Sequence, residues 1–166
     1  MAVTYDFISK ITTSGSTGTV SFTSIPQTYT DLVLVYSPQS ASSNSYSYYT
    51  INGDTSSTYY RMCMAGTGST ITPFWGADSG LLYPYYGTYN DTNSQTLFTS
   101  HFMNYASTTS GKVILSRSGN TGASNIADFS SGYYASNTAI TRIDIIQGGQ
   151  NFAANVVFSL YGILAA

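Results

Sequence analysis

Short runs of β-branched and aromatic residues, interrupted every few positions by turn-forming residues, dominate this sequence and restrict it to a β architecture. No window carries apolar residues at helical spacing without Gly, Ser, Thr or Asn interrupting it, so we expect little or no helix. Runs of this length separated by turn clusters are typical of a sandwich or a barrel. We therefore predict an all-β protein, a jelly-roll-like antiparallel β-sandwich of about 8–10 strands.

The chain has the length of one domain. Its 166 residues fall within the roughly 100–200 residues of a single domain, so we predict one sandwich over residues 1–166. The predicted strands are Tyr5 to Ile11, Thr19 to Ser24, Asp31 to Ser37, Ser45 to Ile51, Thr58 to Met64, Leu97 to Asn104, Lys112 to Ser118, Phe129 to Tyr134, Ala139 to Ile146 and Val156 to Ile163. Tight turns are predicted at Asn52-Gly53 and Gly148-Gly149, because these residues tolerate positive φ.

Two of these strands differ in the way apolar residues follow one another. Leu32 to Val35 are apolar without alternation, which indicates a strand that is either covered on both faces or packed against a neighbouring subunit. In Ala139 to Ile146 the residues Thr141, Ile143 and Ile145 lie on one face, while Arg142 and Asp144 lie on the other, which we expect to be solvated.

Two further segments are candidates for contact with a partner. Residues 1–12 form a possible docking arm or edge strand, whose alternate positions 5, 7 and 9 are Tyr5, Phe7 and Ser9. Residues 65–96 are predicted as a long loop region rich in Tyr and Gly. Its aromatic residues either pack on the protein or on a neighbouring subunit, or stack against a ligand. The candidate exposed residues of this loop are Trp75, Tyr83, Tyr85 and Tyr86.

The scarcity of charge excludes several classes of protein. Only 7% of the residues are charged, while 42% are hydrophobic, and intrinsic disorder requires the opposite balance. The net charge of −2 gives no basic surplus with which to bind nucleic acid. No apolar stretch reaches the ~20 residues that cross a bilayer, so we expect no membrane partner. Roughly fifty Ser and Thr residues supply the polar surface instead, and so neutral a surface favours association into an assembly.

Residues suited to catalysis or metal binding are few. His101 is the only histidine and lies in a predicted strand, so we interpret it as a structural residue. Cys63 is the only cysteine, which excludes an intrachain disulfide and indicates a buried thiol. One His and one Cys cannot complete a zinc site. A pair of Asp residues could cleave a glycosidic bond, but no spacing singles out such a pair. We predict that the protein is not an enzyme and uses no cofactor or metal.

Several sequence blocks resemble small β-sandwich structural proteins of tailed phages, of the cyanophage and marine phage type. The resemblance spans nearly the whole chain, and its first and last blocks are the more specific. The blocks are Phe22 to Leu34 (FTSIPQTYTDLVL), Ile51 to Asp54 followed by Tyr59-Tyr60, Phe102 to Ala106 (FMNYA), Asn137 to Ile145 (NTAITRIDI), Asn151 to Ala154 (NFAA) and Phe158 to Ile163 (FSLYGI). The segment from Trp75 to Tyr89 matches no block.

The resemblance implies a structural protein of the virion. We expect a capsid decoration protein, a homotrimer that binds the major capsid protein on the outside of the head and bridges its subunits. The alternative is a tail-fibre tip that adheres to a host surface glycan. The N-terminus lacks the basic region and apolar run of a signal peptide, so we expect synthesis in the cytoplasm of a host bacterium.

Overall fold

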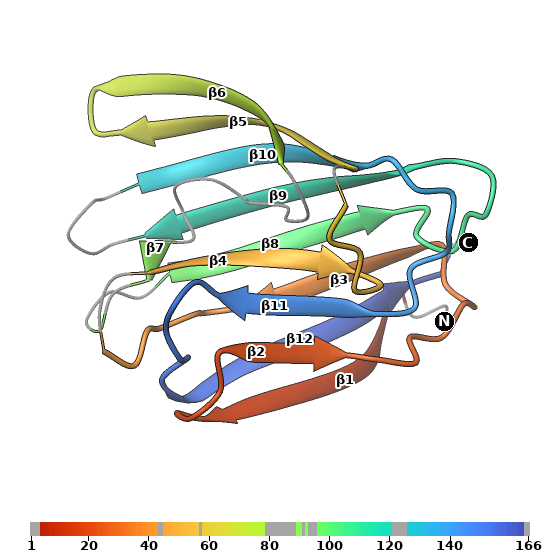
Figure 1. Ribbon diagram of the computed structural model, residues 1–166, viewed down its shortest axis with the longest axis horizontal. Helices are drawn as coiled ribbons and strands as arrows, with labels where there is room; N and C mark the ends of the chain where they lie inside the picture. Colours follow the sequence, from red (N-terminus) through yellow and green to blue (C-terminus); the bar gives the residue numbers. More distant parts are fainter. Residues whose placement is uncertain are drawn as a thin grey trace.

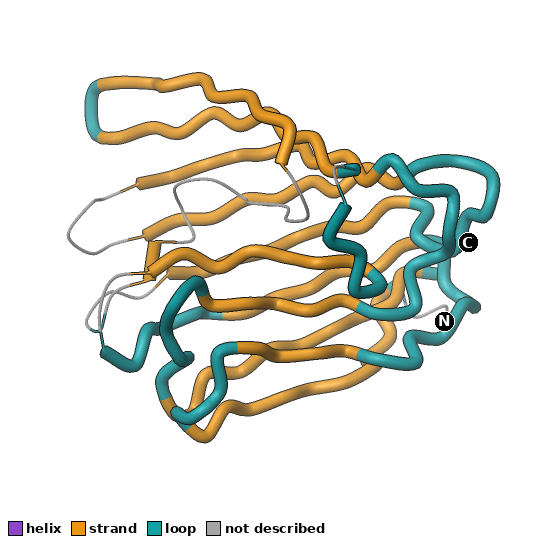
Figure 2. Tube along the Cα trace, viewed as in Figure 1, coloured by secondary structure: helices purple, strands orange, loops and turns teal. Residues whose placement is uncertain are grey.

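Two antiparallel sheets build the protein, as the sequence predicted. The computed structural model describes residues 4–42, 45–56, 58–78, 89–90, 92, 96–120 and 126–164. Its strands are β1 (Tyr5–Ser14), β2 (Thr19–Phe22), β3 (Asp31–Tyr36), β4 (Ser45–Ile51), β5 (Tyr59–Thr67), β6 (Thr70–Asp78), β7 (Tyr89–Asn90), β8 (Thr96–Met103), β9 (Lys112–Asn120), β10 (Ile126–Tyr134), β11 (Ile143–Gln147) and β12 (Ala154–Ile163). No helix is present among the described residues, and Figure 2 shows strands joined by loops and turns.

The two sheets differ in size. The large sheet has eight strands in the order β1-β12-β3-β8-β9-β10-β5-β6, and the small sheet has four in the order β2-β11-β4-β7. Figure 1 shows the small sheet in front of the first half of the large one, while β5 and β6 extend past it. The small sheet therefore lies against one side of the large sheet and covers only part of that side.

Aromatic and aliphatic side chains from both sheets fill the space between them. Tyr49 and Ile145 of the small sheet belong to the same buried cluster as Leu34, Phe98 and Phe158 of the large sheet. The Tyr36 ring stacks on Phe158 at 4.9 Å between centroids and lies 4.8 Å from Phe98. We call this side of the large sheet the inner face, and the opposite side the outer face.

A chain of hydroxyl groups crosses this core. The Tyr36 and Tyr49 hydroxyls lie 3.1 Å apart, Tyr49 lies 3.0 Å from the Ser100 hydroxyl, and Ser100 lies 2.6 Å from Ser116. Burial raises the pKa of Tyr36 and of Tyr49 well above the ordinary value. Both phenols therefore remain neutral, and their hydrogen bonds join the two sheets without leaving polar atoms unpaired.

Over the part that the structure describes, residues 65–96 do not form the long loop that the sequence predicted. β5 continues to Thr67, Gly68 adopts a positive φ of 66°, and β6 pairs with β5 along its whole length. This hairpin was missed because β6 contains Pro73 and Gly76, which weaken a strand pattern. Proline is tolerated there because β6 is an edge strand. The two-residue strand β7 was missed too.

The N-terminal segment is an edge strand, as predicted, but its alternation is interrupted. β1 pairs with β12, and a bulge falls between Phe7 and Ser9. Ile8 and Ile11 pack against the core, while Tyr5 and Phe7 are exposed. Position 9 therefore does not continue the face on which Tyr5 and Phe7 lie.

The charged residues near β11 differ from their prediction. The strand begins at Ile143 rather than at Ala139, and Asp144 is buried rather than solvated. The Arg142 Nε donates to both Asp144 carboxylate oxygens at 2.8 and 2.9 Å, and the Thr50 hydroxyl donates to one at 3.1 Å. Alternation alone could not reveal this pairing, because it depends on the neighbouring strand β4.

The predicted turns and central strand agree with the structure in most respects. Asn52 and Gly53 both have positive φ, as a tight turn requires, whereas Gly149 alone does so in the second pair. In β3, Val33 is buried although it points to the outer face, and Val35 is half-buried.

Candidate assembly surface

The pairing of the strands places one row of side chains across all eight strands of the outer face. The register joins each member of the row to the next through hydrogen-bonded neighbouring strands. From edge to edge, the row consists of Phe7, Tyr161, Val33, His101, Leu115, Ser131, Met62 and Trp75. The two segments singled out in the sequence, at Phe7 and Trp75, therefore mark the two ends of one surface.

Large apolar side chains are exposed over this whole face. Thirteen of the fifteen large apolar side chains that are exposed among the described residues belong to it. They are Tyr5, Phe7, Tyr60, Met62, Met64, Ile71, Trp75, Leu97, Met103, Val113, Phe129, Tyr133 and Val157. Exposure is highest on the β5–β6 hairpin, where Trp75 is 78%, Ile71 74% and Met62 64% exposed.

The exposed apolar side chains of the outer face add up to a large surface. A large aromatic side chain buries roughly 150–250 Å² when it is covered. At the observed exposures the thirteen side chains together offer on the order of 1,000 Å², interrupted by polar residues such as Ser131 and His101. Large exposed apolar patches mark sites of interaction.

A hollow lies within the apolar surface. It has a volume of about 340 Å³ and is lined by Met64, Ile71 and Phe129 around the small residues Gly66 and Ala127. A Cβ atom on Gly66 would meet only the Ala127 carbonyl oxygen, at 3.8 Å. Asp128 also lines this hollow, which lies on the β5–β6 hairpin and β10 near one edge of the large sheet.

Few charges interrupt the outer face. Lys10 and Arg117 point from it, and His101 pairs with Asp31 across β3 and β8. The His101 Nε2 lies 2.9 Å from one Asp31 oxygen, while the other oxygen accepts the backbone N–H of Asn104 at 2.6 Å. The Asp31 carboxylate thus joins β3 both to His101 of β8 and to the turn after β8. Charged side chains are therefore few on this face, among many apolar ones.

The structure brings together some predicted contact residues and leaves others aside. Tyr5, Phe7 and Trp75 lie on the outer face and are exposed. Tyr83, Tyr85 and Tyr86 lie outside the described residues. The methionines of β5 and Phe129 of β10, near the β6 edge of the surface, were not predicted as contact residues, although in β5 (YYRMCMAGT) both alternating sets are largely apolar. That double apolar pattern was the available signal.

The described residues contain neither a cluster of metal-ligating side chains nor a helix that could span a membrane. Cys63 is buried, as predicted, and nowhere in the described ranges do three or more His, Cys, Asp or Glu side chains group so as to hold a metal ion. Within the same ranges no helix is long and apolar enough to cross a membrane.

Comparison with known proteins yields distant structural similarity alone. No family model and no curated protein matches the chain. Among solved structures, it is similar to the galectin LEC-6 of Caenorhabditis elegans, with 16% identity, a TM-score of 0.30 and 95% of each chain covered. A protein of unknown function from Shewanella oneidensis, SO2946, is 10% identical with a TM-score of 0.23, covering 98% of this chain and 77% of that one.

Proposed function

We propose that this protein is a structural protein of a virus particle, a capsid decoration protein that docks through the outer face of its large sheet. The observation that carries the proposal is the exposed apolar surface from Phe7 to Trp75. Its order of 1,000 Å² is comparable with the ~800 Å² that each partner contributes to a standard interface. The sequence blocks shared with phage structural proteins suggest the particle, and the major capsid protein is the proposed partner.

Docking by this face has defined physical properties. Burial of apolar surface stabilises an interface by roughly 25 cal/mol per Å², before the costs of association are deducted. Because the face holds few charges, the interaction depends little on salt. A homotrimer would contact several shell subunits at once. Its affinity for the shell would therefore exceed that of a single copy. The shell subunits bridged in this way would resist separation.

Substitution on the outer face tests the proposal. In Met62→Asp a charge replaces an apolar side chain in the row across the sheet, and we expect binding to shells of the major capsid protein to weaken by roughly 30-fold or more. Tyr46→Asp is the matched control, because Tyr46 is comparably exposed on the small sheet. It should bind as the unchanged protein does. Unchanged binding by Met62→Asp would contradict docking through this face.

The number of copies per particle decides between head and tail. Quantitative staining of virions should give hundreds of copies for a decoration protein. A handful of copies would instead favour the alternative position at a tail-fibre tip. Sedimentation of the purified protein tests the trimer separately, since monomers at micromolar concentration would contradict it.

A further inference from the structure

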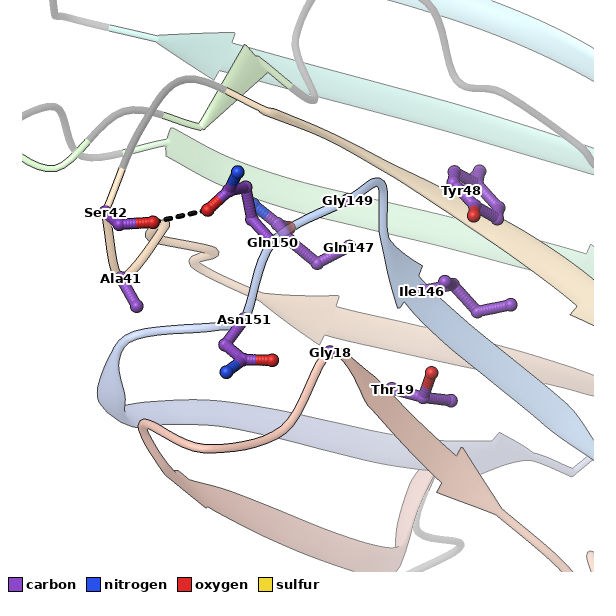
Figure 3. A pocket seen from close by; sticks show the side chains of 10 residues that line it. All are labelled: Gly18, Thr19, Ala41, Ser42, Tyr48, Ile146, Gln147, Gly149, Gln150 and Asn151. Carbon is purple, nitrogen blue, oxygen red and sulfur yellow. Dashed lines mark hydrogen bonds between the residues drawn. The ribbon is translucent and has the colours of Figure 1, made fainter.

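A second hollow lies on the other side of the molecule, on the solvent side of the small sheet. Its volume is about 520 Å³, within the roughly 300–1,000 Å³ of known ligand pockets. Figure 3 shows side chains from β2, β4 and β11, and from the chain segments beside them, arranged around it. We call it the polar hollow, and it shares no lining residue with the apolar surface of the outer face.

The floor of the polar hollow is a row across three strands. Thr19 of β2 pairs with Ile146 of β11, and Ile146 pairs with Tyr48 of β4. All three lie on the side of the small sheet that faces away from the core, because their neighbours Val20, Ile145 and Tyr49 are buried in it. The floor thus offers an aromatic ring, an aliphatic side chain and a hydroxyl group at fixed positions.

The rim of the polar hollow carries amide and hydroxyl groups. The Ser42 hydroxyl donates to the Gln150 Oε1, which orients that amide so that its Nε2 presents two N–H donors. Asn151 adds a second amide, whose Oδ1 lies beside Gly18 (Figure 3). Donors and acceptors therefore stand together above an aromatic and aliphatic floor.

The backbone around the rim is fixed. The Gln147 N–H donates to the Gly18 carbonyl at 2.8 Å, and the Ala41 N–H donates to the Asn151 carbonyl at 3.0 Å. A Cβ atom on Gly18 would lie 2.8 Å from the Gln150 carbonyl oxygen, so these two segments pack as closely as their backbones allow. Little of the binding free energy would be spent on ordering such a site.

The chemistry of these side chains selects the ligand. All ten lining residues are neutral, so nothing in the polar hollow compensates the charge of a phosphate, a carboxylate or an ammonium group. Neutral amides that both donate and accept suit hydroxyl groups, and a ring such as that of Tyr48 suits the apolar face of a sugar. We propose that the polar hollow binds a neutral saccharide. It lies on the opposite side from the outer face, so a docked protein would present it to solution.

A titration with neutral sugars tests this inference. We expect glucose, galactose, mannose, N-acetylglucosamine or a disaccharide of these to shift amide NMR signals of Tyr48, Ile146 and Asn151, with dissociation constants on the order of 1 mM. Ala41→Trp fills the hollow from an exposed position, and Tyr48→Ala removes the ring of the floor. Each should weaken binding at least tenfold.

Matched controls separate this inference from the proposed function. Met62→Asp alters the outer face alone, and it should bind sugars as the unchanged protein does. Absence of shifts with every neutral sugar would overturn the proposal, and so would binding that survives Ala41→Trp. A preference for sugars bearing a carboxylate would also contradict it, because the polar hollow holds no cation.

Discussion

The two faces of the large sheet are both apolar, yet only one of them is covered. On the inner face Phe98 and Phe158 are fully buried against the small sheet, and on the outer face Phe129 and Trp75 are exposed. The sequences of these strands do not reveal which face is covered, because β5, β8 and β10 each have apolar residues on both sides. A sheet that is apolar on both sides can pack against one layer on each side. This chain provides one such layer, the small sheet.

The polar groups on the two faces differ as well. The inner face includes the hydroxyls of Ser100 and Ser116. Ser100 is hydrogen-bonded to Tyr49 of the opposite sheet, and Ser116 is hydrogen-bonded to Ser100. The outer face has the His101–Asp31 pair and two separate cations, none of which needs a covering sheet. The polar groups of the inner face are therefore matched to the small sheet, whereas those of the outer face are paired or solvated without one.

Removal of one phenylalanine ring from each face should give the largest difference. Phe98→Ala leaves a cavity beside Tyr36 and Tyr49 and should lower the free energy of unfolding by about 3–5 kcal/mol. Phe129→Ala removes an exposed ring and should change it by about 0.5 kcal/mol or less. Urea unfolding at low protein concentration measures both values. Equal losses would show that the outer face is already covered in the isolated protein.

Two glycines on opposite faces sharpen the comparison. A Cβ atom on Gly162 would lie 2.3 Å from the Tyr29 ring, so Gly162→Ala should destabilise the protein by about 1–3 kcal/mol. Gly119 points to the outer face, with nothing within 4 Å of such an atom. Gly119→Ala should therefore stabilise the protein slightly, by up to about 0.5–1 kcal/mol. A melting temperature that falls equally in both variants would contradict the assignment of the two faces.

Acid should lower the free energy of unfolding by less than Phe98→Ala does, through one carboxylate at the junction between the sheets. Asp54 follows β4, and its carboxylate accepts hydrogen bonds from the Ser56 hydroxyl and backbone N–H at 2.6 and 2.8 Å and from the Tyr134 hydroxyl at 3.0 Å. These bonds, led by that of the Ser56 hydroxyl, hold the pKa of Asp54 below its ordinary value. The folded carboxylate therefore binds a proton more weakly than the unfolded one, and its contribution exists above about pH 4.

The corresponding variant is Asp54→Asn. It should lower the free energy of unfolding by about 1 kcal/mol at neutral pH, and the difference from the unchanged protein should shrink as the pH falls through the pKa of the folded carboxyl group. Urea unfolding across the acid range measures this convergence. Asp6→Asn is the comparison, because one hydrogen bond from Tyr29 reaches that carboxylate. A difference independent of pH would contradict the role of the charge.

Much of the fold could be predicted from local patterns. The ten strands found in the sequence all exist, because their β-branched and aromatic runs are bounded by turn residues such as Asn52 and Gly53. Strand β6 escaped prediction because Pro73 breaks its pattern, and an edge position that only pairing reveals makes that proline acceptable. The bulge after Phe7 was equally invisible, since it depends on the register with β12.

The candidate sites were less accessible to sequence reasoning than the strands. Phe7 and Trp75 were singled out as separate contact residues, but their membership of one row follows from the pairing of eight strands. The polar hollow had no signal at all, because Ser42, Tyr48 and Gln150 are ordinary neutral residues far apart in the chain.

The sequence by itself determined that this chain forms β-strands with few charges, and that several of those strands are apolar on both sides. Only the tertiary structure decided which side is covered. The physical reason is that a side chain's face depends on its own strand, whereas its burial depends on which distant strands lie over it. Here a four-stranded sheet covers most of the inner face, and the apolar side chains from Phe7 to Trp75 on the outer face remain exposed.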